Sequence, residues 1–193
     1  MAMRLGIVSD IHGNTAALAR ALALMGPIDR LLCLGDSIDQ FRFSNEVVEL
    51  LREHDALAIQ GNHEALFFGD GGSRARDASW IDDGLRSWLA ARPDRERLSY
   101  SGKSLLLVHA TPWESDWDYV YPHSPAFSRF AEAEAEIVIY GHTHQPVITR
   151  VGATLVVNPG STGHGHPAGD GFRLSCAVLD LAAGTGRLIE FTL

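Results

Sequence analysis

The sequence predicts one α/β (or α+β) domain, residues 1–193, folded as a four-layer αββα sandwich of two mixed sheets with helices outside. Two observations support this prediction. Strand-like and helical segments alternate up to Ile59, which is typical of a right-handed wind with largely parallel strands. The rest of the chain is rich in short strands joined mostly by glycine turns, which indicates a second sheet. A chain of 193 residues can bury one sizeable core.

The first part of the chain alternates strands and helices. Apolar runs predict strands at 4–9, 30–34 and 56–59. Residues 14–25 have apolar side chains at helical spacing, and Gly26-Pro27 ends that helix. An amphipathic helix is expected over 44–54, with Ser44 as its N-cap. This part is therefore expected to form the parallel centre of the first sheet.

The second part is predicted to be mostly strand. Residues 69–76 are glycine-rich and charged, so a loop is expected there, followed by a helix over 78–91 with Trp80 and Leu85 on one side. Ser101-Gly102-Lys103 predicts a hairpin between 97–100 and 104–108. A helix is expected over 124–135, with Pro125 at its first position. The remaining predicted strands are 137–140, 147–150, 154–157, 174–180 and 187–193.

Composition and charge exclude several classes of protein. The net charge of −8 argues against bulk binding of nucleic acid, which needs a basic surface. No apolar run approaches the roughly 20 residues of a membrane-spanning helix, and Met1-Ala2-Met3-Arg4 does not resemble a signal peptide. Cys33 and Cys176 lie in apolar runs and are expected to be buried free thiols. We therefore expect a cytoplasmic protein, and the sequence leaves its oligomeric state open.

Five polar clusters follow directly after apolar strands. They are Ser9-Asp10-Ile11-His12-Gly13-Asn14, Gly35-Asp36, Gly61-Asn62-His63-Glu64, His109, and Gly141-His142-Thr143-His144. In α/β sheets the carboxyl ends of strands are where ligands bind, so these side chains are expected to converge. Mixed carboxylate and imidazole donors suit Mn, Fe, Zn, Ni or Co better than calcium. The sequence therefore predicts a metal site, and the absence of cysteine donors argues against a structural zinc finger.

Each cluster taken alone also has an ordinary structural explanation. Asp-x-His and His-x-His place two donors on the same side of an extended turn, and the glycines before Asp36, Asn62 and His142 allow a sharp turn out of the strand. Yet Gly-Asp is usually a turn, Asn62 could be a helix N-cap, and His109 could be a satisfied core histidine. The occurrence of all five in order, each at a strand end, favours the metal site.

This ordered set resembles the signature of the calcineurin-like metallophosphoesterases. The resemblance is closest to the small prokaryotic branch of phosphodiesterases and diadenosine-tetraphosphatase-related proteins, and it covers nearly the whole chain. The segments that carry it include SDIHGN, AIQGNHE, LLLVHATP, YGHTHQP and VNPGST. It implies a dinuclear metal-dependent phosphoesterase in which a hydroxide between two divalent ions attacks phosphorus in line. Mn²⁺ is the ion expected, with Fe, Zn, Ni or Co as alternatives.

The resemblance also implies a role for each site residue. The seven ligands would be Asp10, His12 and His144 for the first ion, Asn62, His109 and His142 for the second, and Asp36 as the bridge between them. His63 would be catalytic without being a ligand, donating a proton or stabilising charge at the leaving group. Asn14 opens the first helix, where it would contact substrate phosphate.

The substrate is expected to be a small-molecule phosphate ester or nucleotide. Asp36 is followed by Ser37-Ile38-Asp39-Gln40-Phe41, whereas Ser/Thr phosphatases and symmetrical dinucleoside tetraphosphatases have x-x-Asp-Arg-Gly. An arginine suits a dianionic monoester, so its loss favours diesters, although Arg42 lies nearby. The alternatives are a phosphomonoesterase or nucleotide pyrophosphohydrolase at the same site, and a non-catalytic scaffold of the same fold.

Two further segments attract attention. The aromatic residues of loop 111–123 could form a lid or a base-stacking wall, or could pack against the 78–91 helix: Trp113, Trp117, Tyr119 and Tyr121. Gly163-His164-Gly165-His166 looks like another metal motif, but we expect it to be a flexible surface loop.

Overall fold

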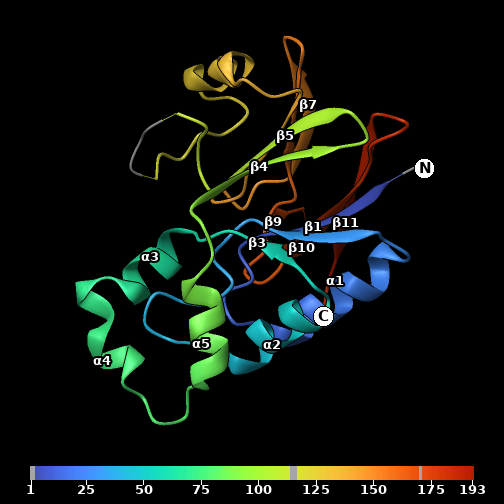
Figure 1. Ribbon diagram of the computed structural model, residues 1–193. Helices are drawn as coiled ribbons and strands as arrows, with labels where there is room; N and C mark the ends of the chain where they lie inside the picture. The colour runs from blue at the N-terminus through green and yellow to red at the C-terminus, as the bar shows by residue number, and fades with distance from the viewer. Residues whose placement is uncertain (1–2, 114–116, 170) are drawn as a thin grey trace.

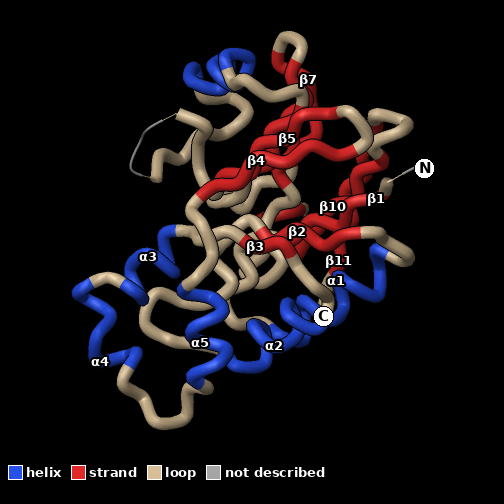
Figure 2. The backbone as a smooth tube through the Cα atoms, viewed as in Figure 1, coloured by secondary structure: helices blue, strands red, loops and turns tan. Residues whose placement is uncertain are grey.

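The protein contains two mixed sheets, as the sequence predicts. The computed structural model describes residues 3–113, 117–169 and 171–193 (Figures 1 and 2). The first sheet has the order β11 (Thr185–Phe191), β10 (Gly171–Asp180), β1 (Arg4–Val8), β2 (Arg30–Cys33) and β3 (Leu57–Ala58), and β9 (His166–Ala168) pairs with β10. The second has the order β4 (Arg95–Tyr100), β5 (Lys103–Val108), β6 (Ile137–Ile139), β8 (Thr154–Asn158) and β7 (Val147–Val151).

Each sheet has a parallel centre and antiparallel edges. Strands β1, β2 and β3 run parallel, and so do β5, β6 and β8. Strands β10, β11, β4 and β7 pair antiparallel with their neighbours. The carboxyl ends of six parallel strands are therefore available to carry a site, and the predicted 101–103 hairpin turn between β4 and β5 is confirmed.

Three apolar clusters stack through the molecule and explain its layers. Along β5, Leu105 and Leu107 point into the core between the sheets, whereas Leu106 and Val108 point to the outer face. Helices α1 (Thr15–Met25) and α2 (Asn45–Glu53) cover the other face of the first sheet. A 3₁₀ helix, η2 (Pro125–Glu132), covers the outer face of the second sheet. The predicted four-layer order is thus confirmed.

The structure corrects three predicted elements. The 69–76 segment is helical rather than loop: it contains the 3₁₀ turn η1 (Asp70–Gly72) and α4 (Ser73–Arg76) after α3 (Asn62–Phe68). The guanidinium of Arg76 donates to the carbonyls of Phe67 and Gly69, which fixes this compact turn. The 78–91 helix is shorter, α5 (Asp83–Ala90), because Asp82 caps it by accepting from Leu85 N at 2.8 Å.

The third correction concerns residues 124–135, where a regular helix was expected. This segment is the 3₁₀ helix η2, which begins at Pro125 as predicted and ends at Glu132. Side chains three residues apart eclipse one another in a 3₁₀ helix. Phe127 and Phe130 therefore both face the second sheet, where they pack with Tyr140.

Cys33 and Cys176 are both buried and free, as predicted. Within the described parts of the chain, no helix has the length and apolar character needed to cross a membrane.

Candidate metal centre

The five polar clusters meet at the carboxyl ends of the parallel strands of the two packed sheets. Asp10 and Asp36 follow β1 and β2, His109 follows β5, and His142 and His144 follow β6. The backbone amide of His142 donates to Asp10 Oδ2 at 3.1 Å, which ties the end of the second sheet to the end of the first. The structure therefore brings together side chains up to about 130 residues apart in sequence, as predicted.

The Asp10 cluster consists of Asp10, His12 and His144. The Nε2 atoms of His12 and His144 are 3.2 Å apart, and His144 Nε2 is 3.3 Å from Asp10 Oδ1. Asp10 is fully buried, yet among the described residues no donor hydrogen-bonds to its Oδ1 with good geometry. A buried carboxylate oxygen without a donor is costly unless a cation offsets its charge.

The His109 cluster consists of Asn62, His109 and His142, with Asp36 beside it. His109 Nε2 lies 3.1 Å from Asn62 Oδ1 and 3.3 Å from Asp36 Oδ2. His109 Nδ1 donates to the carbonyl of Leu34 at 2.6 Å, which directs Nε2 to the site. Ligand atoms of Asp36, His109 and His142 lie within 4.8 Å of one another, a spacing that one ion can span.

The backbone of the site residues is left-handed rather than extended. Asp10, His12, Asp36, His142 and His144 have φ values of 53°, 49°, 50°, 64° and 57°. Backbone hydrogen bonds hold these turns in register, including Asp10 N to Gly35 O at 3.1 Å and His12 N to Asp36 O at 3.0 Å. The expectation of extended turns is wrong. Left-handed backbone costs non-glycine residues about 1–3 kcal/mol each and concentrates at functional sites.

The glycines before the site residues serve two different needs. Gly35 has a φ of +89°, so it supplies the sharp turn that the sequence predicts before Asp36. Gly61 has an ordinary φ of −106°, but a Cβ at this position would lie 2.3 Å from Asp36 Oδ1. Glycine at 61 is therefore required by the close approach of two loops rather than by a turn.

Glu64 positions the loop that carries Asp36, a role that the sequence analysis missed. This buried carboxylate accepts hydrogen bonds from the backbone amides of Asp36 at 2.8 Å, Ser37 at 2.7 Å and Gly61 at 2.8 Å. It thus joins the loop after β2 to the first turn of α3. The Gly-Asn-His-Glu motif contained the residue, but its contacts come from a loop more than 20 residues away in sequence.

Burial and charge move the pKa values of His12 and His109, two of the buried imidazoles, in opposite directions. Burial lowers the pKa of His12 to about 4, although Asp10 and Asp36 oppose this shift. Burial also opposes protonation of His109, but the charge of Asp36 and its hydrogen bond outweigh it and raise the pKa of His109 to about 10. Burial opposes ionisation of Asp36, yet neighbouring His109 lowers its pKa below the ordinary value. His12 is therefore neutral at neutral pH, while His109 and Asp36 form an ion pair.

His63, predicted to be catalytic, lies at the edge of both clusters. Its Nε2 is 3.8 Å from Asp36 Oδ2, and its ring centroid is 4.6 Å from that of His12. Its Nδ1 accepts a hydrogen bond from Gln40 N at 3.0 Å. Because Nδ1 is the acceptor, the proton of a neutral His63 lies on Nε2, which faces the site.

Asn14 caps α1, where it was expected to open the helix. Its Oδ1 accepts from Ala17 N at 3.1 Å, and its Nδ2 donates to the carbonyl of Gly163 at 3.0 Å. The side chain thus connects the start of α1 to the loop after β8.

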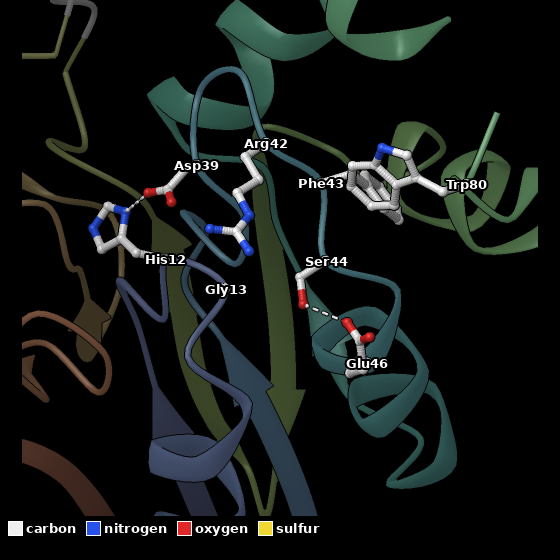
Figure 3. A pocket seen from close by; sticks show the side chains of 8 residues that line it. All are labelled: His12, Gly13, Asp39, Arg42, Phe43, Ser44, Glu46 and Trp80. Atoms are coloured by element: carbon white, nitrogen blue, oxygen red, sulfur yellow. Dashed lines mark hydrogen bonds and ion pairs between the residues drawn. The ribbon is translucent and has the colours of Figure 1, made fainter. Parts of the chain in front are cut away.

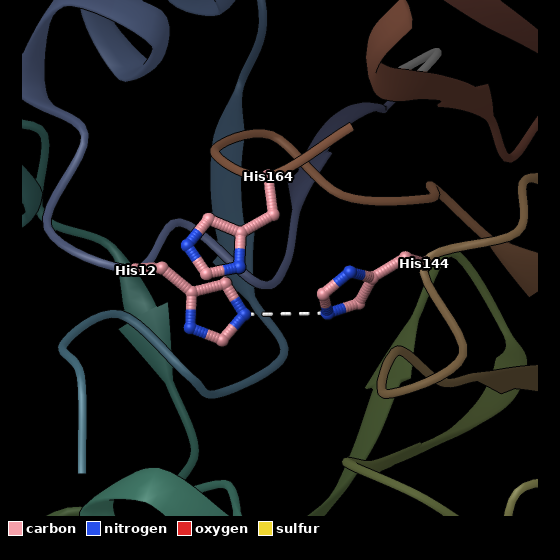
Figure 4. Close-up of side chains that lie close together, drawn as sticks. All are labelled: His12, His144 and His164. Carbon is pink, nitrogen blue, oxygen red and sulfur yellow. Dashed lines mark hydrogen bonds between the residues drawn. The ribbon is translucent and has the colours of Figure 1, made fainter. Parts of the chain in front are cut away.

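His164 lies exposed in a loop, as predicted, but its ring is brought next to the site. Its ring stacks on that of His12, with centroids 3.9 Å apart and an angle of 10° between the planes (Figure 4). His166 differs, because it lies in β9 and its Nε2 is 3.0 Å from Glu190 Oε1.

Two pockets adjoin the Asp10 cluster. One, of about 350 Å³, is lined by His12, Asp39, Arg42, Glu46 and Trp80, among others, and the guanidinium of Arg42 points into it (Figure 3). The other, of about 580 Å³, is lined by His142, His144, Tyr119, Tyr121 and His166, among others. His12 lines the first pocket and His144 the second, and the Nε2 atoms of these two residues are 3.2 Å apart.

Part of the aromatic loop lines the larger pocket. Tyr119 stacks on His142 with ring centroids 4.0 Å apart, and the carbonyl of Trp117 lies 2.8 Å from His142 Nε2. Trp113 packs on Phe130 of η2, not on the 78–91 helix. The alternative of packing against that helix is therefore wrong for these residues, while residues 114–116 lie outside the described residues.

The comparisons with known proteins identify the family. The calcineurin-like phosphoesterase superfamily domain matches residues 3–184, so the chain belongs to this superfamily of metal-dependent phosphoester hydrolases, and the resemblance seen in the sequence is confirmed. An uncharacterized protein of Methanocaldococcus jannaschii is 27% identical over 173 residues, which span 81% of this chain and 68% of that protein.

Solved structures share the fold. A metallophosphoesterase from Sphaerobacter thermophilus superimposes with a TM-score of 0.80 and 24% identity, covering 100% of this chain and 89% of that one. An archaeal phosphodiesterase superimposes with a TM-score of 0.65 and 21% identity, covering 98% and 100% of the two chains. At these identities, the likeness bears on the fold alone.

Proposed function

We propose that residues 1–193 act as one domain that hydrolyses phosphodiesters with two divalent ions, Mn²⁺ being the first choice. Asp10, His12 and His144 would hold one ion, and Asn62, His109 and His142 the other, with Asp36 between them. The donor set supports this assignment, since it combines carboxylate, imidazole and amide donors at short mutual distances. The Oδ1 of Asp10 is buried, and within the described part of the chain it has no hydrogen bond of good geometry, so an ion would stabilise it.

The bound ions would lower the pKa of water and screen the charge that grows on the phosphoryl oxygens. The protein would orient the His109 ligand and would supply a hydrogen-bond donor, His63, to the leaving group. His109 is held by the Leu34 carbonyl, so its Nε2 is directed before any ligand arrives. Because Gln40 N donates to Nδ1, the Nε2–H group of His63 would donate a hydrogen bond to the leaving oxygen and stabilise the charge that develops there.

Two of these assignments require local exchange of hydrogen bonds. His142 Nε2 contacts the carbonyl of Trp117, so ligation through Nε2 requires the 117–119 segment to give up that contact. A contact between the Asn14 carboxamide and substrate phosphate requires Asn14 to release Gly163 or the α1 cap.

The choice of diesters rests on the two pockets, one lined by His12 and the other by His144. A diester carries two organic groups on one phosphorus, and pockets on either side of the site offer a place for each. The 350 Å³ pocket, here called the Arg42 pocket, borders His12 on the side of the site where His63 and Asp39 lie. Since His63 is the proposed leaving-group residue, this pocket would receive the leaving group. The Tyr119 pocket would receive the group that stays on phosphorus.

The test is a pair of rates with added Mn²⁺, on bis-p-nitrophenyl phosphate and on p-nitrophenyl phosphate. We expect a higher kcat/KM on the diester. A strong preference for the monoester would overturn the diester assignment, and no turnover of either compound would favour a non-catalytic scaffold.

One observation favours the second candidate, a phosphomonoesterase or nucleotide pyrophosphohydrolase. The usual arginine after Asp39 is absent, but Asp39 and Arg42 pair across a tight turn that brings the Arg42 guanidinium to the pocket (Figure 3). A guanidinium there could bind a dianionic phosphate. Substitution Arg42→Ala separates the two: a large rise in KM on the monoester alone would support this candidate.

A further inference from the structure

The loop after β8 is built onto the loop that carries Asp10 and His12. Thr162 N donates to the Ser9 carbonyl at 2.9 Å, Gly163 N to the Asp10 carbonyl at 3.0 Å, and Ser161 Oγ to the same carbonyl at 2.8 Å. A Cβ on Gly163 would lie 1.7 Å from the Ile11 carbonyl oxygen, so the two backbones are in direct contact. The residue that follows Gly163 is therefore held in place relative to the Asp10 cluster.

That residue is His164, and its backbone amide is also anchored. His164 N donates to Ser161 Oγ at 2.9 Å, the hydroxyl that binds the Asp10 carbonyl. Its imidazole lies over His12, with a ring-centroid distance of 5.9 Å to His144. Figure 4 shows a nitrogen of His164 directed to the same side as the His12 nitrogen that faces His144.

The three imidazoles satisfy the spacing of ligands to one ion. One ring nitrogen from each of His12, His144 and His164 lies within 4.8 Å of the other two. Two nitrogens bound to the same ion by bonds of about 2.1 Å are roughly 3–4 Å apart. The rings of His12 and His164 lie nearly parallel, so their in-plane lone pairs do not point to one place. Binding of one ion by both rings requires His164 to tilt out of the stack, and the exposed His164 and partly exposed His144 have room to rotate.

We propose that His164 is an additional ligand, a third imidazole on the ion held by the Asp10 cluster. This proposal rests on the proposed function in one respect, the ion at the Asp10 cluster, and does not depend on which substrate is cleaved. A third imidazole favours borderline metals such as Zn²⁺, Ni²⁺, Co²⁺ and Cu²⁺ over Mg²⁺ or Ca²⁺. It would therefore make the Asp10 cluster a tighter and more nitrogen-rich site than its carboxylate and two histidines alone.

The test measures ion binding directly, by calorimetric titration of chelator-treated protein with Mn²⁺. We expect His164→Ala to lower the affinity for one of the two ions by about 10-fold or more and to leave the affinity for the other unchanged. His166→Ala is the matched control, since it removes a histidine two residues away whose partner is Glu190, and it should bind both ions like the wild type.

A second variant separates ligation from packing. His164→Phe keeps an aromatic ring on His12 but offers no nitrogen, so it should bind ions as weakly as His164→Ala. Wild-type affinity in His164→Phe would show that the ring acts only by positioning His12. Wild-type affinity in His164→Ala would show that His164 has no role in ion binding. Either result overturns the proposal.

A spectroscopic measurement completes the test. With Co²⁺ in place of Mn²⁺, loss of a nitrogen ligand should alter the visible absorption of His164→Ala and His164→Phe, but not of His166→Ala. A wild type that binds two ions yet cleaves no ester would contradict the proposed function and leave this proposal standing. A wild type that binds no ion at the Asp10 cluster would contradict both.

Discussion

The two clusters of the site differ in how the protein holds them. At the His109 cluster, the His109 side chain is 0% exposed and its Nδ1 is fixed by the Leu34 carbonyl, although His142 of this cluster lines the larger pocket. At the Asp10 cluster, Asp10 is also 0% exposed, but the His144 side chain is 29% exposed, and His12 and His144 each line one of the two pockets. On the proposed function, His109 would be a rigid anchor for one ion, and the exposed side of His144 would give the substrate access to the other.

The residue that joins the clusters should matter most. Asp36→Asn keeps the Oδ1 acceptor for His63 N but removes a charge that lies within 4.8 Å of a ring nitrogen of His12 in one cluster and of His109 in the other. We expect kcat to fall by about 10³-fold or more and both ions to bind more weakly. Turnover and Mn²⁺ stoichiometry would be measured together, with exposed Asp83→Asn as control. An effect on one ion alone would show that Asp36 belongs to one cluster and does not bridge.

His63 should affect chemistry without affecting either cluster. His63→Ala removes the Nε2 proton, and we expect kcat on the diester to fall by about 10²–10⁴-fold with Mn²⁺ stoichiometry unchanged. Surface His123→Ala is the control. If His63→Ala lost an ion, His63 would be a ligand, as its distance of 3.8 Å from Asp36 would allow. Unchanged turnover would remove its role at the leaving group.

Glu64 should stabilise the loop that carries Asp36, and its loss should lower the free energy of unfolding. Glu64→Gln places an amide NH₂ group against backbone N–H donors from Asp36, Ser37 or Gly61. Because a buried donor is left unpaired, we expect a loss of about 1–3 kcal/mol in the free energy of unfolding. Urea denaturation of the chelator-treated protein measures this loss, with exposed Glu53→Gln as control. Equal stability of the two variants would mean that the loop is held by other contacts.

The smallest effect expected is a pH dependence that differs between the clusters. In chelator-treated protein the pKa of His109 is raised from 6.5 to about 10, so its contribution to stability is fully present below pH 6.5 and is lost as pH rises towards 10. The pKa of His12 is lowered from 6.5 to about 4, so it costs stability as pH falls from 6.5 to 4.

Stability without metal should therefore decline on both sides of about pH 6.5. Denaturation midpoints measured from pH 4 to 10 test this profile. The denaturation midpoint of His109→Gln should change less with pH on the alkaline side, and that of His12→Gln should change less on the acidic side. If each variant flattened the opposite side, the assignment of the two shifts to the two clusters would be wrong.

The sequence alone predicted the parts of the site that depend on residue type and order. Asp10, His109 and His142 could be found because each follows an apolar strand, and strand ends converge in this fold. The layers followed from the alternation of strands and helices. These features depend on local patterns of apolar and polar residues, which a sequence displays directly.

Other features depend on contacts between distant segments and could not be predicted in this way. The left-handed backbone of Asp10 and Asp36 is fixed by hydrogen bonds between loops, and the role of Glu64 comes from amides in the loop after β2. His164 was predicted to lie on a flexible surface loop. The sequence did not show that Gly163 lies against the backbone of Ile11, a contact that brings His164 next to His12.

The most direct test of the central claim, two ions sharing Asp36, is anomalous diffraction from crystals grown with Mn²⁺. We predict two peaks, one contacted by Asp10, His12 and His144 and the other by Asn62, His109 and His142, both within ligand distance of Asp36. A single peak, or two peaks of which only one contacts Asp36, would contradict this account.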